Sequence, residues 1–287
     1  MQSMKDALAD QLAAVLEGSH DQHLFALIDG ALQPDAWGVL SRRFKVASLL
    51  PEATDGGKSA VAALPFLLGM DAEHAADVIR HTADLAFEHH AATWLRSPML
   101  LSALAPRLAH RLQGRVPDMD VMLRFADARV LPALHSVLDS EQAQTFFAGV
   151  TAWWYLDRDM RLTELALPDN DRDSVASDPW AGPLALTADQ ESTLMALSEP
   201  DVVIALIAQH DAQALAKIPK TSHHRFVKEQ LLAARDWDIT SSADQALFCM
   251  IALDQSPEAL ASDAWQRALQ QVKSKRISLM QALEQLT

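Results

Sequence analysis

Short apolar runs alternate with amphipathic segments over the first half of the chain. Apolar runs bounded by turn residues are typical of strands, and apolar positions three or four residues apart are typical of helices. The runs predict six strands, within residues 23–30, 45–51, 62–70, 91–97, 120–127 and 150–157. Helical spacing between them predicts an α/β or α+β lobe, with a mixed or mainly parallel β-sheet flanked by helices.

Residues that commonly begin or end helices give the expected helix boundaries. Pro34 and Asp35 precede one helix, Asp71 is expected to cap the next, and Ser97-Pro98 is expected to open a third that ends at Gly114. A fourth helical stretch covers residues 128–149.

The pattern changes sharply at residues 166–183, where prolines, aspartates and glycine leave no periodic apolar face. We therefore predict an α/β lobe at 1–165, a linker at 166–183 and an all-helical lobe of five or six short helices at 184–287. Thr187 and Ser241 or Ser242 are expected as N-caps, and Pro200 is expected in a first helical turn.

Composition and charge narrow the class of protein. The 287 residues are 49% hydrophobic and 22% charged, as in an ordinary globular chain, and the net charge is −14. The part up to Leu165 holds 14 basic and 21 acidic residues, and the remainder holds 10 and 17. Because both parts are acidic, nucleic acid and anionic membrane surfaces are not expected as partners.

Cys249 is the single cysteine, which excludes an intramolecular disulfide and a cysteine-based zinc site. The N-terminal segment is acidic and amphipathic, unlike a signal peptide, and no apolar run is long enough to span a membrane. The expected location is the cytoplasm.

Sequence motifs for catalysis are missing. The chain has no G-x-S-x-G elbow, no phosphate-binding glycine loop and no H-E-x-x-H. Three aspartates, Asp29, Asp127 and Asp157, each close an apolar run, so they could gather at a sheet edge to hold a metal ion or act as acid and base. The alternative function is therefore a metal-dependent hydrolase that uses these strand-end aspartates. In the structural interpretation, each instead caps the turn or helix that follows it. We expect no enzyme activity and no metal or cofactor.

The stretch MLRFADARVL, residues 122–131, places charges inside an apolar run. Arg124, Asp127 and Arg129 could form a catalytic centre, a docking surface or a structural clasp. Arginine forms bidentate bonds with carboxylates, so a clasp would pair one of these arginines with Asp127 or another acid. We favour the clasp first and docking second.

Several motifs together resemble a bacterial family filed as domain of unknown function 4123. They are LFALIDGA around Asp29, RSPMLLSALAPRLAHRL, and the stretch from Pro117 to Tyr155. The family signature reads Arg-Phe-aromatic-Asp-Pro-Arg-Val-Leu, followed by a glutamine-containing helix and a Phe-Phe-Gly ending. Here the signature positions are Arg124, Phe125, Ala126, Asp127, Ala128, Arg129, Val130 and Leu131. Ala126 replaces the aromatic residue and Ala128 replaces the proline.

The resemblance implies a function without catalysis. Members of that family are adaptors, or effector chaperones, of type VI secretion, which hold a toxic effector in the cytoplasm and load it onto a spike protein of the VgrG type. The implied partners are thus the cognate effector and the spike. A helical lobe with large apolar side chains suits shielding of apolar cargo. The candidates for effector binding are Phe226, Trp237 and Trp265, with Phe248 and Met250.

Overall fold

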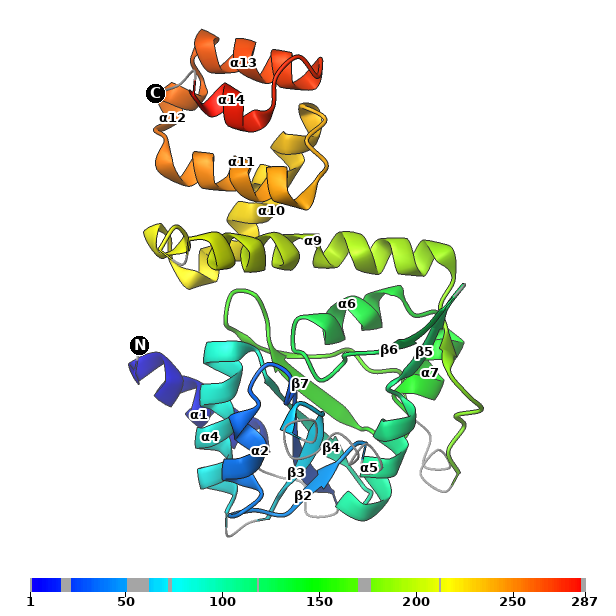
Figure 1. The fold of residues 1–287 in the computed structure, drawn as a ribbon. Coiled ribbons are helices and arrows are strands. Elements are labelled where there is room, and N and C mark those ends of the chain that lie inside the picture. The colour runs from blue at the N-terminus through cyan, green and yellow to red at the C-terminus, as the bar shows by residue number, and fades with distance from the viewer. Residues whose placement is uncertain are drawn as a thin grey trace. The chain divides into compact units, whose positions relative to one another are not determined.

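The computed structural model describes residues 2–16, 22–50, 62–71, 74–117, 119–169, 177–211 and 213–284. The chain divides into two compact units, Met1–Leu194 and Met195–Thr287 (Figure 1). The lobe limits 1–165, 166–183 and 184–287 stay predictions, and residues 170–176 of the predicted linker lie outside the described residues.

A six-stranded sheet forms the centre of the first unit. Its strands, in spatial order, are β2 (Val46–Ser48), β3 (Phe66–Met70), β1 (His23–Ile28), β4 (Ala92–Ser97), β7 (Ala152–Leu156) and β8 (Leu162–Glu164). The predicted fold class is confirmed, with a sheet and helices in the first half of the chain and helices after it. The expected mixed or mainly parallel pairing is wrong for this sheet, because every neighbouring pair is antiparallel.

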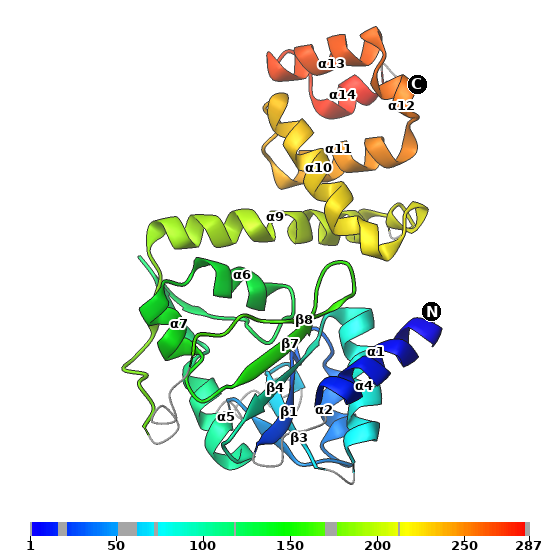
Figure 2. The same ribbon diagram turned by 180° about the vertical axis from the view of Figure 1, so that it is seen from behind.

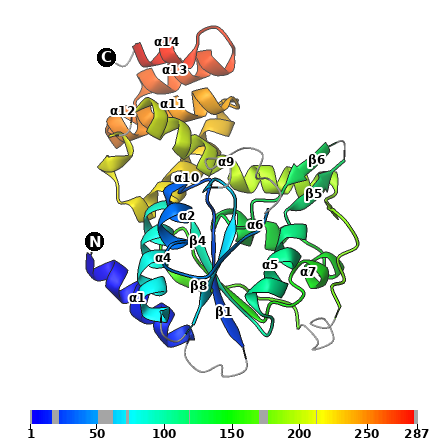
Figure 3. The ribbon, with the colours of Figure 1, turned by 60° about the horizontal axis from the view of Figure 1, so that its bottom comes forward.

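The alternation of strands and helices predicted parallel pairing, and β3 and β4, which are joined by a helix, do run in the same direction, but β1 lies between them and is antiparallel to both. Helices cover both faces of this sheet. Phe25 and Leu27 of β1 belong to one buried cluster, and the alternate residues Ala26 and Ile28 belong to another. Strands buried on both faces have continuous apolar runs, a pattern usually found in parallel sheets. One face packs on α1 (Gln2–Leu16), α2 (Asp35–Leu40) and α4 (Ala75–His89), and the other on α5 (Leu101–His110), α6 (Val130–Val137) and α7 (Ser140–Phe146) (Figure 3).

Two buried tryptophans, one on each face, carry polar groups into these clusters. The Trp94 indole N–H donates to Thr82 Oγ1 at 2.9 Å, and the Trp153 indole N–H donates to Thr93 Oγ1 at 3.0 Å. Each buried N–H is therefore satisfied, which removes the cost of burying it.

A second sheet of three strands was not predicted. It contains β6 (Met119–Met122), β5 (Gln113–Val116) and β9 (Leu184–Ala185), with β5 antiparallel to β6 and parallel to β9. The helix expected to end at Gly114 ends at His110 instead. Gly114 lies in β5, where a Cβ atom would stand 2.7 Å from Leu123 Cδ2, so the close packing of two segments selects glycine.

Other boundaries also differ from the sequence prediction. The stretch 128–149 forms two helices, because Asp139 and Gln142 make a capping box that starts α7. Asp71 does not cap α4 directly: its carboxylate accepts the backbone N–H of His74, one residue before the helix begins.

Gly30 and Gly38 provide a matched test of the packing at the end of β1. A Cβ atom on Gly30 would stand 2.3 Å from the carbonyl oxygen of Ala62, whereas Gly38, inside α2, has nothing within 4 Å. We expect Gly30→Ala to lower the free energy of unfolding by about 2 kcal/mol, because backbone must move. Gly38→Ala should raise it by about 0.5–1 kcal/mol. Urea denaturation of both variants checks this, and equal stabilities would contradict the packing described.

Helices make up the second unit (Figure 2). Its α-helices are the C-terminal part of α9 (Ala188–His210), followed by α10 (His223–Asp236), α11 (Ser242–Asp254), α12 (Pro257–Leu260), α13 (Asp263–Lys273) and α14 (Leu279–Glu284). Two short 3₁₀ helices, Leu215–Lys217 and Lys220–Ser222, connect α9 to α10. Thr187 and Ser241 are N-caps as predicted, but Pro200 lies inside the single helix α9, which replaces two predicted helices.

None of the helices in the described ranges combines the length and apolarity needed to cross a membrane.

Candidate functional site

The signature segment, Arg124–Leu131, connects β6 to α6 in a tight turn. The strand predicted over 120–127 ends at Met122. The backbone N–H of Asp127 donates to the Arg124 carbonyl at 3.0 Å, and the N–H of Leu131 donates to the Asp127 carbonyl at 3.1 Å. The charges of the segment therefore lie at a strand-to-helix junction.

Asp127 and Arg129 form the predicted ion pair within this segment. Arg129 donates from Nε to Oδ1 at 2.9 Å and from Nη2 to Oδ2 at 2.7 Å. The backbone N–H of Arg129 also donates to Oδ1 at 2.9 Å. The Asp127 side chain is 3% exposed, so its charge is buried but fully engaged.

Arg124 binds a second buried carboxylate, that of Asp29. Its Nη2 donates to Asp29 Oδ2 at 2.9 Å, and Asp29 Oδ1 accepts the backbone N–H of Ala31 at 2.9 Å. The Asp29 side chain is 5% exposed and that of Arg124 is 41% exposed. This pair joins the end of β1 to a segment 95 residues further along the chain.

The apolar members of the signature segment are core residues. The Phe125 ring packs edge-on against Phe146 at 5.3 Å and Trp153 at 6.0 Å between ring centroids. Ala126 and Ala128, the two departures from the family signature, are both buried. The Ala128 N–H donates to the carbonyl of His90 at 3.1 Å, a bond that proline could not make.

Asp157, the third aspartate of the hydrolase alternative, closes the β7–β8 hairpin. Its Oδ1 accepts the backbone N–H groups of Asp159 and Arg161, both at 2.9 Å. Each of the three aspartates is thus engaged by its own donors. Across the described ranges, no three His, Cys, Asp or Glu side chains come close enough to hold a metal ion.

A buried arginine, Arg111, is the charged residue that sequence reasoning missed. Its side chain is 0% exposed and binds both carboxylate oxygens of Asp178, one of them at 2.7 Å. It also donates to the carbonyls of Arg107 and Thr145 at 3.0 and 3.3 Å. The guanidinium stacks 4.9 Å from the Trp180 ring centre.

Asp178 and Trp180 belong to the predicted linker, and we call Asp178–Trp180 the strap. Burial alone would raise the pKa of Asp178, but the hydrogen bonds and charge of Arg111 outweigh it and lower that pKa below its ordinary value. The strap therefore holds an ionised carboxylate against a buried cation. No local pattern in the sequence marks this pair, since its members are 67 residues apart.

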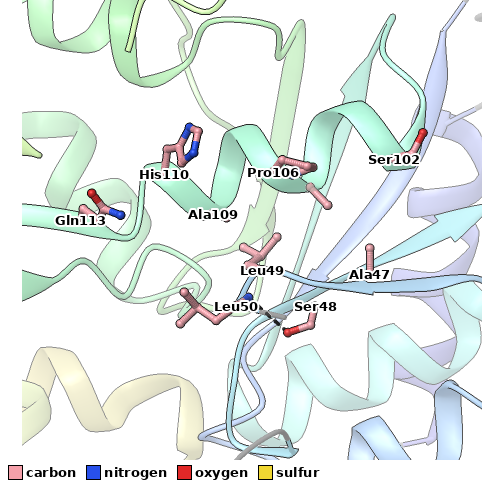
Figure 4. A pocket seen from close by; sticks show the side chains of 10 residues that line it. Ala47, Ser48, Leu49, Leu50, Ser102, Pro106, Ala109, His110 and Gln113 are labelled. Carbon is pink, nitrogen blue, oxygen red and sulfur yellow. Dashed lines mark hydrogen bonds between the residues drawn. The ribbon is translucent and has the colours of Figure 1, made fainter. Parts of the chain in front are cut away.

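A groove of about 550 Å³ lies between strand β2 and helix α5 (Figure 4). Leu49 and Leu50 line it from the strand side, and Ser102, Pro106 and His110 line it from the helix. We call it the β2–α5 groove. Among the described residues that line it, none is an Asp, Glu, Lys or Arg.

The candidate effector-binding residues of the second unit are largely core residues. Trp265 is 2% exposed and Phe248 is 7% exposed, so both stabilise the helical core. Phe226, Trp237 and Met250 are partly buried against the same unit's apolar clusters. Their proposed contact with an effector stays a prediction.

Residues 24–145 match the family model described as domain of unknown function (DUF4123). This segment is less than half of the chain and contains Asp29 and the whole signature segment. No curated protein and no solved structure matches the chain.

Proposed function

We propose that this protein is a non-enzymatic adaptor of type VI secretion that binds a toxic effector in the cytoplasm and loads it onto a VgrG-like spike protein. The observation that carries the proposal is the DUF4123 match over residues 24–145, which includes the signature segment. The function follows from the resemblance of those motifs to the adaptor family.

The geometry of the signature charges favours a role in bracing the fold. Asp127 accepts three hydrogen bonds from Arg129, and Asp29 is bound by Arg124 and a backbone N–H. Carboxylates engaged in this way are poor candidates for acid–base chemistry, which needs a group free to exchange protons with a substrate. The family signature then maintains a scaffold on which partner surfaces are presented.

No feature of the site specifically supports the alternative of a metal-dependent hydrolase. Asp29, Asp127 and Asp157 each bond to separate donors, and none of the described His or Cys side chains joins them in a cluster. We therefore retain the adaptor as the single proposed function.

Co-purification tests this proposal directly. We expect a spike gene and a toxin gene beside the gene for this chain, and we expect the full-length protein to co-purify with the products of both. A protein that binds neither product, but has a hydrolytic activity that Asp127→Asn abolishes, would overturn the adaptor proposal.

A further inference from the structure

Strand β2 is an edge strand of the six-stranded sheet, and some of its backbone N–H and C=O groups face outward. The Gly69 N–H donates to the Lys45 carbonyl at 2.9 Å, and the Leu49 N–H donates to the Pro65 carbonyl at 3.0 Å. Because a strand alternates its bonding direction, Val46 and Ser48 direct their backbone groups to the outer edge. Those groups bond to no other residue in the described part of the chain.

The β2–α5 groove runs beside these backbone groups. Its floor contains the buried side chains of Leu49 and Ala105. Pro106 has no N–H to donate to the carbonyl of Ser102, so the helix leaves this acceptor without its usual partner. An apolar floor next to unpaired backbone donors and acceptors is the arrangement that recognises an extended peptide by strand addition.

Charge at the two ends of the groove narrows the class of peptide. A Cβ on Gly69 would lie within 4 Å of both Leu101 and the Lys45 carbonyl, which places the start of α5 beside Lys45. The Lys45 side chain is 81% exposed, 3.8 Å from Asp71, and the last turn of α5 carries Arg107 and His110. At the α5 end, Asp178 already lies 4.0 Å from His110 and interacts with Arg107, so Lys45 is the exposed cationic group beside the groove, in a chain whose net charge is −14.

We infer that the β2–α5 groove binds an extended segment of the effector, which adds to β2 as a further strand. Its alternate side chains are apolar and enter the groove, since alternate residues of a strand share a face. An acidic residue bounds this segment at the end next to Lys45 and pairs with that side chain. The inference rests on the proposed function, because the occupant is the effector.

The test uses the full-length protein and the toxin encoded beside it. Dissociation constants are measured for wild type and for Ser102→Trp, which fills the groove from an exposed position. Ala103→Trp is the matched control, since Ala103 is also exposed in the first turn of α5 but does not line the groove. We expect at least about tenfold weaker binding for Ser102→Trp and no change for Ala103→Trp.

Two charge-reversal variants test the acidic end of the segment. Lys45→Glu should weaken binding about fivefold at low salt, with the effect shrinking as salt is added. Lys228→Glu changes the net charge equally at an exposed position of α10 and should leave binding unchanged. Twelve-residue peptides tiling the toxin should include one competitor with alternating apolar residues and an acidic residue at one end.

Hydrogen exchange of the complex separates the possible outcomes. Protection of the Val46 and Ser48 amides, but not of those facing outward on β8, is the expected result. If the toxin binds wild type while these amides stay unprotected and Ser102→Trp binds normally, the groove inference is wrong and the adaptor function stands. If wild type does not bind the toxin, the proposed function and the inference that rests on it both fail.

Discussion

Asp178→Ala is expected to lower the free energy of unfolding of the first unit by about 3 kcal/mol. Arg111 is 0% exposed, and its guanidinium binds both oxygens of Asp178. Removal of the carboxylate leaves a buried cation without its counter-charge, which costs several kcal/mol in comparable pairs. Urea denaturation followed by tryptophan fluorescence measures the loss.

A control variant and a double variant test whether the loss of stability comes from the unpaired charge of Arg111. Asp159→Ala removes an exposed carboxylate that bonds to no other side chain in the described part of the chain, and it should change stability by less than about 0.5 kcal/mol. Arg111→Met combined with Asp178→Leu should be more stable than Asp178→Ala alone, since no buried charge remains unpaired. A stable Asp178→Ala protein would show that the strap does not hold this unit together.

The same pair gives stability a defined pH dependence. Arg111 lowers the pKa of Asp178 below the ordinary value of 3.8, so the folded state binds a proton at this site less readily than the unfolded state. The stabilisation is therefore fully present above about pH 3.8 and is lost as the pH falls through the folded-state pKa. The difference between wild type and Asp178→Ala should shrink in that acidic range.

Asp127→Ala is expected to lower the free energy of unfolding by about 3 kcal/mol, with a parallel loss of effector binding. The change removes three hydrogen bonds from Arg129, two of them from the guanidinium, at a site 3% exposed. Charge-assisted bonds contribute about 1.5–3 kcal/mol each in buried settings. Thermal melting and co-purification with the neighbouring toxin are the two measurements.

Asp120→Ala is the matched control for this variant. Asp120 pairs with Arg115 on the exposed face of β6, where both side chains are more than half exposed, so its loss should cost less than about 0.5 kcal/mol. Loss of effector binding by Asp127→Ala with an unchanged melting temperature would assign the signature charges to a docking surface. Full stability and full binding would exclude both roles.

Local sequence patterns were sufficient to locate most elements of the first unit. The apolar runs at β1, β3, β4 and β7 identify those strands because each is short, continuous and bounded by turn residues. The alternation of strands and helices could not give the pairing, because β3 and β4, which are joined by a helix and run in the same direction, are separated in the sheet by β1, which is antiparallel to both.

At the candidate site, ion pairs between residues far apart in the sequence could not be predicted from the sequence. The spacing of Asp127 and Arg129 made their ion pair predictable, because an aspartate at a turn can reach the residue two positions on. Neither the Arg124–Asp29 pair nor the Arg111–Asp178 pair has such a local signal. The prediction for Gly114 was wrong for a different reason, since its neighbour Leu123 is only nine residues away but reaches it only when β5 and β6 pair.

The Arg111–Asp178 pair also bears on the order of events during synthesis. Asp178 follows Arg111 by 67 residues. At a translation rate of about 5–20 residues per second, Asp178 is therefore synthesised roughly 3–13 s after Arg111. Until then, burial of Arg111 beneath α7 would leave a cation unpaired in an apolar site. Synthesis of the segment that matches the family, residues 24–145, ends within that interval. A nascent chain of that length lacks β7, β8 and the strap, and we expect it to remain open and to need protection from aggregation until about residue 186 has emerged.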